Sequence, residues 1–292
     1  MSKGALIYSF NDTYPIARKV SNILKCDSSL ISSKSFPDGE LLIRLHENPS
    51  NRDVFIISSM ALNPEKRMIE TYLAAGAARD HGARRVILLA TYMPYLRQDK
   101  SFNNYESISA KHVMSMMVSI FDKVLVIDPH LHRINSLKEY SSKAGEISSN
   151  KIVADFLKKM KGDFTIIGPD EESDQWTKDI AKLLGKKVHV LIKNRSSSYN
   201  VKVSGDNFKL TENVVVIDDI ISTGNTISES LKLIKKRGAK KITCIGIHGI
   251  LAGDAAKKIT KYARLITTNT IPSKYSKIDI SPLLAEKIKE EI

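Results

Sequence analysis

An apolar run that ends in two carboxylates and a hydroxyl-rich turn constrains the fold of this chain more than any other stretch. Residues 214–217 are four consecutive apolar residues, a pattern typical of a buried parallel strand. Asp218 and Asp219 follow, and the strand is expected to stop at them; after the turn, an amphipathic run over residues 227–237 predicts a helix. This order predicts an α/β unit with a ligand site at the carboxyl end of the strand.

The turn is suited to an anion because backbone N–H groups, hydroxyls and a helix N-terminus converge there. Its residues are Ser222, Thr223, Gly224, Asn225 and Thr226. The two preceding carboxylates could accept hydrogen bonds from sugar hydroxyls or hold Mg²⁺, so that one sugar phosphate would occupy both parts. The alternative is an ordinary strand-to-helix turn that binds nothing, in which Thr226 and Glu229 form a capping box.

The segment resembles the phosphoribosyl-binding motif of type I phosphoribosyltransferases and of the ribose-phosphate pyrophosphokinase family. The resemblance implies that Asp218 and Asp219 bind ribose hydroxyls and that the turn holds the 5-phosphate of ribose 5-phosphate. Two positions depart from the usual pattern: Ser222 stands where many bacterial members carry Asp, and Asn225 where a small residue is usual.

Composition permits two domains and excludes several classes of protein. The chain has 292 residues, and its 42% apolar and 26% charged residues are ordinary for a globular protein. The formal charge of +13 is compatible with nucleic acid or with anionic small molecules, but the basic residues are scattered, so we expect no nucleic-acid binding. Cys26 and Cys244 have no metal-site spacing, and no run reaches the roughly 18 apolar residues of a membrane span. We expect a cytoplasmic protein with no membrane contact.

An internal repeat predicts a duplicated domain. Residues 81–86 (His-Gly-Ala-Arg-Arg-Val) match residues 237–242 (Arg-Gly-Ala-Lys-Lys-Ile), and residues 54–59 align with residues 214–219. The first copy carries Ser58 and Ser59 where the second has two aspartates, which assigns the sugar phosphate to the second. We expect domains over residues 1–147 and 148–292, with the last helix a candidate to pack back on the first domain.

Two polar segments of the first half are candidates for a nucleotide site. The first is a turn that contains Phe36, Asp38, Gly39 and Glu40; the second follows a predicted strand and contains Arg97, Gln98 and Asp99. An aromatic ring can stack on a base, and a guanidinium binds phosphate, but solvated loops would look the same. Both segments resemble the ATP-binding segments of the pyrophosphokinase family, and a plain phosphoribosyltransferase would need neither.

Three further segments gain meaning from the resemblance. Asp128-Pro129-His130 ends a predicted strand, and Asp170 follows another; the resemblance implies that His130 contacts ATP and that His130 and Asp170 help to hold Mg²⁺. A zinc site is discounted because no second cluster of soft ligands exists. Lys193 and Arg195 begin a Ser-rich loop, and by resemblance they are the catalytic cations, with Arg195 also near ribose 5-phosphate. A satisfied loop histidine and a solvated basic turn remain the alternatives.

Taken together, the resemblance implies two duplicated phosphoribosyltransferase-type (type I) α/β domains, each a mainly parallel sheet flanked by helices. It further implies transfer of the β,γ-pyrophosphoryl group of ATP to ribose 5-phosphate, with Mg²⁺ and a homodimer or hexamer. No Walker sequence is present, so the ATP site is not expected to be a P-loop. A phosphoribosyltransferase and a non-catalytic relative of the synthetase are the alternatives.

Overall fold

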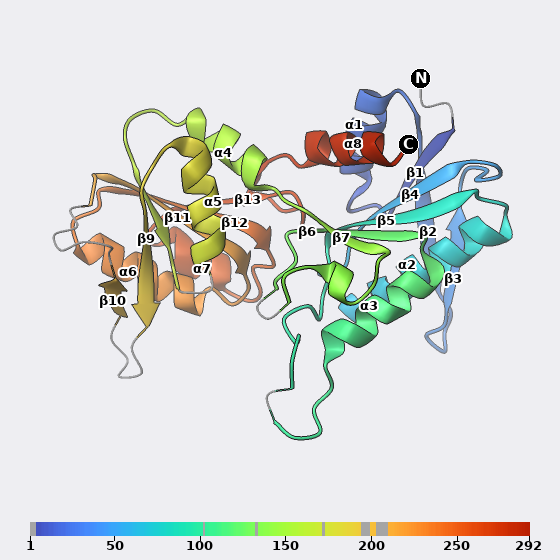
Figure 1. Ribbon diagram of the computed structural model, residues 1–292, viewed down its shortest axis with the longest axis horizontal. Helices are drawn as coiled ribbons and strands as arrows, with labels where there is room; N and C mark the ends of the chain where they lie inside the picture. Colours follow the sequence, from blue (N-terminus) through green and yellow to red (C-terminus); the bar gives the residue numbers. More distant parts are fainter. Residues whose placement is uncertain (1–3, 102, 132–133, 171–172, 194–198, 203–209) are drawn as a thin grey trace. The chain divides into compact units, whose positions relative to one another are not determined.

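The computed structural model describes residues 4–101, 103–131, 134–170, 173–193, 199–202 and 210–292, which form two compact units (Figure 1). Unit 1 comprises Met1–Ser148 and Ile280–Ile292, and unit 2 comprises Ser149–Asp279. The division lies one residue from the expected boundary, and the last helix belongs to unit 1.

Unit 1 contains a sheet with the strand order β3-β2-β1-β4-β5-β6-β7. β3 pairs antiparallel with β2, and the remaining recorded pairs are parallel. The strands are β1 (Ala5–Ser9), β2 (Asp27–Ser35), β3 (Leu41–Leu45), β4 (Asp53–Ser59), β5 (Arg85–Tyr92), β6 (Lys123–Ile127) and β7 (Ala144–Ile147). The helices are α1 (Tyr14–Leu24), α2 (Pro64–Asp80), α3 (Ser109–Ile120), the short 3₁₀ helix η1 (Leu137–Glu139) and α8 (Ser281–Glu291).

Unit 2 repeats this plan with the strand order β10-β9-β8-β11-β12-β13-β14. β10 pairs antiparallel with β9, as β3 does with β2. The strands are β8 (Thr165–Gly168), β9 (Val188–Lys193), β10 (Tyr199–Lys202), β11 (Asn213–Ile221), β12 (Lys241–Gly249), β13 (Arg264–Thr268) and β14 (Ser276–Ile278). The helices are α4 (Asn150–Lys158), α5 (Asp174–Leu184), α6 (Asn225–Lys236) and α7 (Ala255–Thr260). The identical strand orders confirm the predicted duplication.

The apolar run in β11 is explained by a helical layer on each face of its sheet. Val214 and Val216 join a cluster that includes residues of α6 and α7, whereas Val215 and Ile217 join a cluster with residues of α4 and α5. Successive side chains of a strand point to opposite faces, so a strand covered on both faces reads as continuously apolar. Each of these fully buried side chains contributes roughly 1.5–3 kcal/mol.

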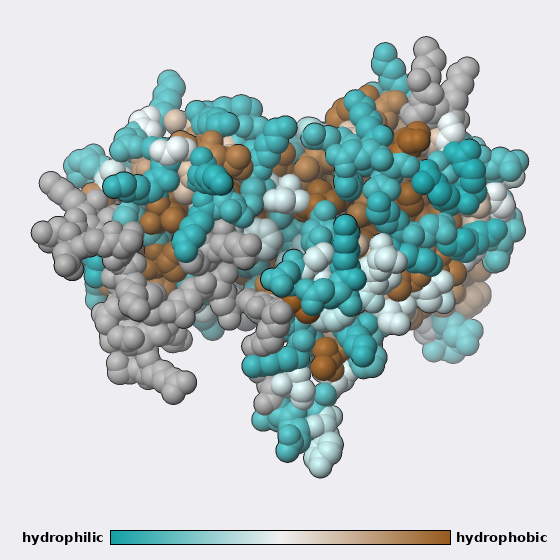
Figure 2. Space-filling view, viewed as in Figure 1, coloured by the Kyte–Doolittle hydropathy of each residue, from teal (hydrophilic) through white to brown (hydrophobic). Residues whose placement is uncertain are grey.

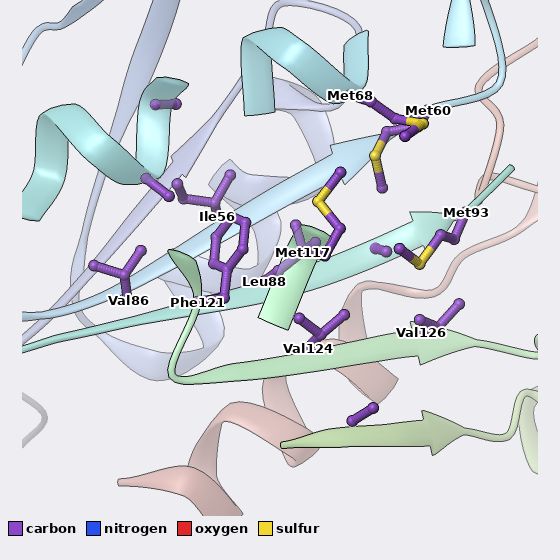
Figure 3. Packing of buried hydrophobic residues seen from close by; sticks show 14 of the residues in the cluster. Ile56, Met60, Met68, Val86, Leu88, Met93, Met117, Phe121, Val124 and Val126 are labelled. Carbon is purple, nitrogen blue, oxygen red and sulfur yellow. The ribbon is translucent and has the colours of Figure 1, made fainter. Parts of the chain in front are cut away.

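The core of unit 1 is rich in methionine. Figure 3 shows Met60, Met93 and Met117 beside β4 and β5, with Phe121 to the left of the methionines. Each of these four side chains is at most 4% exposed. On the face shown in Figure 2, hydrophilic residues cover most of the described surface, and hydrophobic ones appear between them in patches.

The predicted end of the strand that contains residues 214–217 is wrong. β11 does not stop at the carboxylates: it continues through Asp218 and Asp219 to Ile221, paired with β12 up to Gly249. The apolar run marks the buried part of the strand, but backbone pairing extends beyond it. Among the described residues, no helix combines the length and apolarity needed to cross a membrane.

Candidate active site

The turn over residues 222–226 connects β11 to α6 and presents several polar side chains. Gly224 is the N-cap residue of α6, with φ of 71°, and the helix begins at Asn225, two residues earlier than predicted. No side-chain cap closes this end, so the Thr226–Glu229 capping box is wrong. Thr223, Asn225 and Thr226 are exposed. The first backbone N–H groups of α6 therefore face the turn with a partial positive charge, as anion binding requires.

The turn is held by the segment between β12 and α7. The amide N of Leu251 donates to the carbonyl O of Ile221 at 3.0 Å, and that of Ala252 donates to the carbonyl O of Ser222 at 3.1 Å. A Cβ added at Gly224 would lie 3.2 Å from the Cα of Ala255. Glycine is needed here both for its left-handed φ and for this close approach.

The two carboxylates before the turn differ in environment. Asp219 is buried, at 6% exposure, and its Oδ1 accepts a hydrogen bond from the amide N of Ile220 at 2.7 Å. Asp218 is half-buried. Its negative charge adds to burial in raising the pKa of the Cys244 thiol on β12. Because the two aspartates are successive residues of a strand, their side chains leave opposite faces of the sheet.

Asp170 follows β8, the neighbour of β11 in the sheet. Its Oδ1 accepts from the amide N of Ser173 at 3.1 Å, and the Ser173 hydroxyl donates to the carbonyl O of Asp170 at 2.7 Å. The hydroxyl of Ser230 on α6 donates to the carbonyl O of Pro169 at 3.2 Å, which ties this loop to α6. Asp170 and the aspartates of β11 thus lie at the carboxyl ends of adjacent parallel strands.

One of the two predicted catalytic cations, Lys193, lies at the same edge of the sheet. Lys193 is the last residue of β9, which pairs parallel with β8, so it is a strand residue and not part of the predicted loop. Arg195 lies outside the described residues, so its predicted role is untested.

In unit 1 the predicted ATP residues lie on separate elements. Phe36, Asp38, Gly39 and Glu40 form the exposed tip of the β2–β3 hairpin, closed by a hydrogen bond from the amide N of Phe36 to the carbonyl O of Glu40 at 2.8 Å. Arg97 and Gln98 are exposed in the loop after β5, where the Gln98 Oε1 accepts from the Ser109 hydroxyl at 2.7 Å. Asp99, in the same loop, is buried.

The sheet order keeps these two groups apart within one chain. β1 and β4 lie between β2 and β5, which at normal strand spacing separates β2 from β5 by about 14 Å. His130, half-buried, follows β6, the neighbour of β5, and so lies on the Arg97 side of the sheet. Asp128 precedes it, buried, with a left-handed φ of 37°.

The donors present fit Mg²⁺ only if the ion keeps other ligands. Over the described residues, no group of three or more His, Cys, Asp or Glu side chains is placed to hold a metal ion. Mg²⁺ usually binds one or two carboxylates and takes its remaining ligands from water and substrate phosphates. Asp170 suits that role; an imidazole such as His130 is a less usual magnesium ligand and suits hydrogen bonding to phosphate.

Comparisons with known proteins agree with this architecture. The model for the N-terminal domain of ribose phosphate pyrophosphokinase matches residues 5–120, and the phosphoribosyl transferase domain model matches residues 136–279. The chain is 32% identical over 254 residues to the ribose-phosphate pyrophosphokinase of Pyrococcus furiosus, covering 86% of this chain and 90% of that protein. It is 29% identical to the Thermoplasma acidophilum protein of the same name, covering 97% and 98%.

A crystal structure of phosphoribosylpyrophosphate synthetase from Mycobacterium smegmatis has the same fold, with a TM-score of 0.87 over 99% of both chains at 23% identity. Fold and sequence together define a pair of phosphoribosyltransferase-type α/β domains. The chain belongs to the ribose-phosphate pyrophosphokinase family, a family of enzymes. The predicted resemblance and fold class are confirmed.

Sequence reasoning missed the residues that hold the phosphate turn. Leu251, Ala252 and Ala255 contact it from the segment after β12. The only sequence signal was a Gly- and Asp-containing stretch after a strand, which does not say what the stretch packs against.

Proposed function

We propose that this chain transfers the β,γ-pyrophosphoryl group of ATP to the anomeric hydroxyl of ribose 5-phosphate, giving 5-phosphoribosyl 1-pyrophosphate and AMP. The observation that carries the proposal is a family match over nine-tenths of a named pyrophosphokinase, joined to a helix-opening turn beside two aspartates. A plain phosphoribosyltransferase would explain unit 2 but would leave the hairpin tip and the Arg97 loop of unit 1 without a role.

In this proposal unit 2 binds ribose 5-phosphate. The 5-phosphate lies against the N–H groups that open α6 and receives hydrogen bonds from Ser222, Thr223 and Thr226. Asp218 and Asp219 accept hydrogen bonds from the ribose hydroxyls. Because the turn is anchored to the β12–α7 segment, the sugar is oriented before reaction, and orientation is a main contribution in phosphoryl transfer.

The reaction makes one bond and breaks one. The anomeric oxygen bonds to the β-phosphorus and releases its proton, while the bond from that phosphorus to the oxygen of the α-phosphate breaks, and AMP leaves with the electron pair. Lys193 and Arg195 neutralise the negative charge that develops on the transferring group. Mg²⁺, held through Asp170 and His130 with the phosphates, would supply further charge neutralisation.

Unit 1 contributes the ATP contacts. Arg97, Gln98, Asp99 and His130 come from the carboxyl edge at β5 and β6, with Phe36, Asp38, Gly39 and Glu40 from the hairpin tip. The separation of the two groups in one chain favours a homo-oligomer in which a second copy supplies the hairpin. A dimer or a hexamer satisfies this, and a cytoplasmic location stays a prediction.

Phosphorus NMR tests the reaction directly. The purified protein is incubated with ATP, Mg²⁺ and ribose 5-phosphate, beside a matched sample without the sugar. AMP and a pyrophosphate ester that appear only with the sugar would support the proposal. If ATP remains intact under varied metal and phosphate conditions, the proposal is wrong, and bases with phosphoribosyl pyrophosphate become the substrates to try.

A further inference from the structure

Asn225, at the start of α6, carries the most unusual side chain of the phosphate turn. Its Oδ1 accepts a hydrogen bond from the Nζ of Lys258 at 3.0 Å. A lysine ammonium only donates hydrogen bonds, so it must face the amide oxygen and not the amide nitrogen. The Nδ2 group, which only donates, is therefore the end of the amide directed away from Lys258. A donor is what a bound phosphate requires.

Lys258 lies on α7 and forms an ion pair with a neighbouring carboxylate. Its Nζ is 2.7 Å from the Oδ1 of Asp254, one turn earlier, and the two side chains are 35% and 63% exposed. The hydrogen bond from Lys258 holds the pKa of the Asp254 carboxyl below its usual range. Asp254 therefore places a negative charge beside the ammonium that donates to Asn225.

The distance between Lys258 and the turn is set by backbone contacts. The segment that leads into α7 donates two main-chain hydrogen bonds to residues 221 and 222, and Gly224 lies against Ala255. Backbone contacts thus join α7 to the turn. The ammonium of Lys258 is hydrogen-bonded to the side chain of Asn225, the first residue of α6. It therefore lies inside the distance of about 10 Å over which charges act in ordinary salt.

We infer that Lys258 is a positioning residue for the sugar phosphate: it orients Asn225 so that the Nδ2 group donates to the 5-phosphate, and it adds positive charge beside that anion. Asp254 weakens the same interaction by drawing the ammonium toward itself and by repelling the phosphate dianion. The inference rests on the proposed function, because it takes the turn to be the 5-phosphate site.

The test measures ribose 5-phosphate affinity by calorimetry in the full-length protein, with ATP affinity and thermal unfolding measured beside it. Lys258→Met and Asn225→Ala should each weaken ribose 5-phosphate binding by roughly tenfold or more, the loss expected when a hydrogen bond to a charged group is removed. The double variant should lose less than the product of the two, because Lys258 acts through Asn225. Lys258→Arg should restore most of the affinity.

Two variants separate charge from folding. Lys257→Met removes an exposed cation from the same helix and should leave ribose 5-phosphate binding unchanged. Asp254→Asn should tighten binding, a gain that a merely structural role of this helix does not produce. The difference between wild type and Lys258→Met should shrink as KCl rises from about 0.05 M to about 0.5 M, since the Debye length falls several-fold.

The outcomes distinguish this inference from the function on which it rests. If the wild type binds ribose 5-phosphate and Lys258→Met binds it equally well, the inference is overturned and the proposed function stands. The inference would also be overturned if Lys258→Met lost as much ATP affinity as ribose 5-phosphate affinity, or if its unfolding temperature fell enough to account for the weaker binding. If the wild type neither binds ribose 5-phosphate nor forms product, both fail.

Discussion

Asp53, at the start of β4, is a buried carboxylate that binds two arginines. Arg84 donates to its two oxygens at 2.8 and 2.7 Å, and Arg85 at 3.1 and 2.6 Å. The hydrogen bonds from Arg84 are the largest cause of an Asp53 pKa well below its ordinary value, and those from Arg85 lower it further. A carboxyl group with a lowered folded pKa stabilises the protein above its unfolded pKa, near 4, and this stabilisation is lost as the pH falls towards the folded pKa.

Asp53→Asn should therefore lower the free energy of unfolding by about 1–3 kcal/mol at neutral pH, since it removes charge-assisted hydrogen bonds that are partly exposed on the arginine side. Urea titrations at about pH 7, 5 and 3 should show the difference between wild type and variant shrinking below about pH 4.

Asp27→Asn is the matched control. It removes a carboxylate that is 69% exposed and pairs with Arg52 at 2.5 Å, so its cost should be about 0.5 kcal/mol or less. A pH-independent loss in Asp53→Asn, or equal losses in the two variants, would contradict this account of Asp53.

Substitution of Lys193 tests the proposed chemistry directly. Lys193 is the last residue of β9, and Lys193→Ala should lower turnover by roughly 10²–10³-fold, as expected when charge stabilisation of a transition state is lost. Ribose 5-phosphate affinity should change little. Turnover is followed by AMP release; Lys187→Ala, immediately before the first residue of β9, is the control and should remain active. An unchanged rate in Lys193→Ala would remove it from the mechanism.

At the scale of the elements, sequence patterns located buried strands better than exposed ones. The apolar runs in β4 and β11 are sufficient signals because these residues are buried on both faces of each strand. β2 was not predicted: its sequence, Asp-Ser-Ser-Leu-Ile-Ser-Ser-Lys-Ser, is mostly polar and its last four residues are exposed. β2 is held by backbone pairing with β1 and β3, and that pairing leaves no apolar signature.

The sequence likewise predicted some parts of the candidate site and not others. Motifs that directly follow strands could be assigned to one edge of a sheet, because parallel strands end together. The contact of Lys258 with Asn225 joins residues 33 positions apart through the packing of α7 against the turn. No local pattern encodes that contact, so it could not be predicted.

The contact between the phosphate turn and α7 predicts the effect of a substitution at Gly224. Gly224→Ala would put a Cβ in the left-handed region and 3.2 Å from the backbone of Ala255, so α7 must shift. The backbone conformation alone costs about 1 kcal/mol, and the shift adds to it. Gly238→Ala, at the other end of α6, has φ of 96° and open space, so it carries only the backbone cost.

Urea unfolding should therefore show a larger loss for Gly224→Ala than for Gly238→Ala, and calorimetry should show weaker ribose 5-phosphate binding in Gly224→Ala alone. Equal stability losses with unchanged binding in both would mean that the contact with Ala255 does not support the turn.

At the scale of the whole molecule, unit 1 is built from two separate stretches of the chain and unit 2 from one. α4 follows the last strand of the first sheet but packs in unit 2 against α5, and α8 follows the last strand of the second sheet but packs in unit 1 against α1. Since α1 and α5 occupy equivalent places after β1 and β8, both units contain the same helix pair, but unit 2 is continuous in the chain whereas unit 1 takes α8 from beyond unit 2. Figure 1 shows α8 lying beside α1, with the C-terminus next to them.

This arrangement predicts that unit 1 depends on residues that come after unit 2. Ile280, Leu284 and Ile288 are fully buried, and Glu291 binds Lys123 at 2.6 Å and accepts a hydrogen bond from Arg85 at 2.9 Å through its carbonyl O. Deleting residues 280–292 removes several kcal/mol of burial from unit 1, at roughly 1.5–3 kcal/mol for each large side chain, and removes no residue from unit 2.

Hydrogen exchange followed by mass spectrometry should therefore show β1, β5 and β6 losing protection in the deletion variant while β11, β12 and β13 keep theirs. Glu291→Gln is the milder control: it removes the charge pair with Lys123, which is 37% exposed, and should cost less than about 1 kcal/mol. Equal loss of protection in both sheets would mean that the units fold as one cooperative body. Unchanged protection in β1 would mean that α8 only covers a surface that is stable without it.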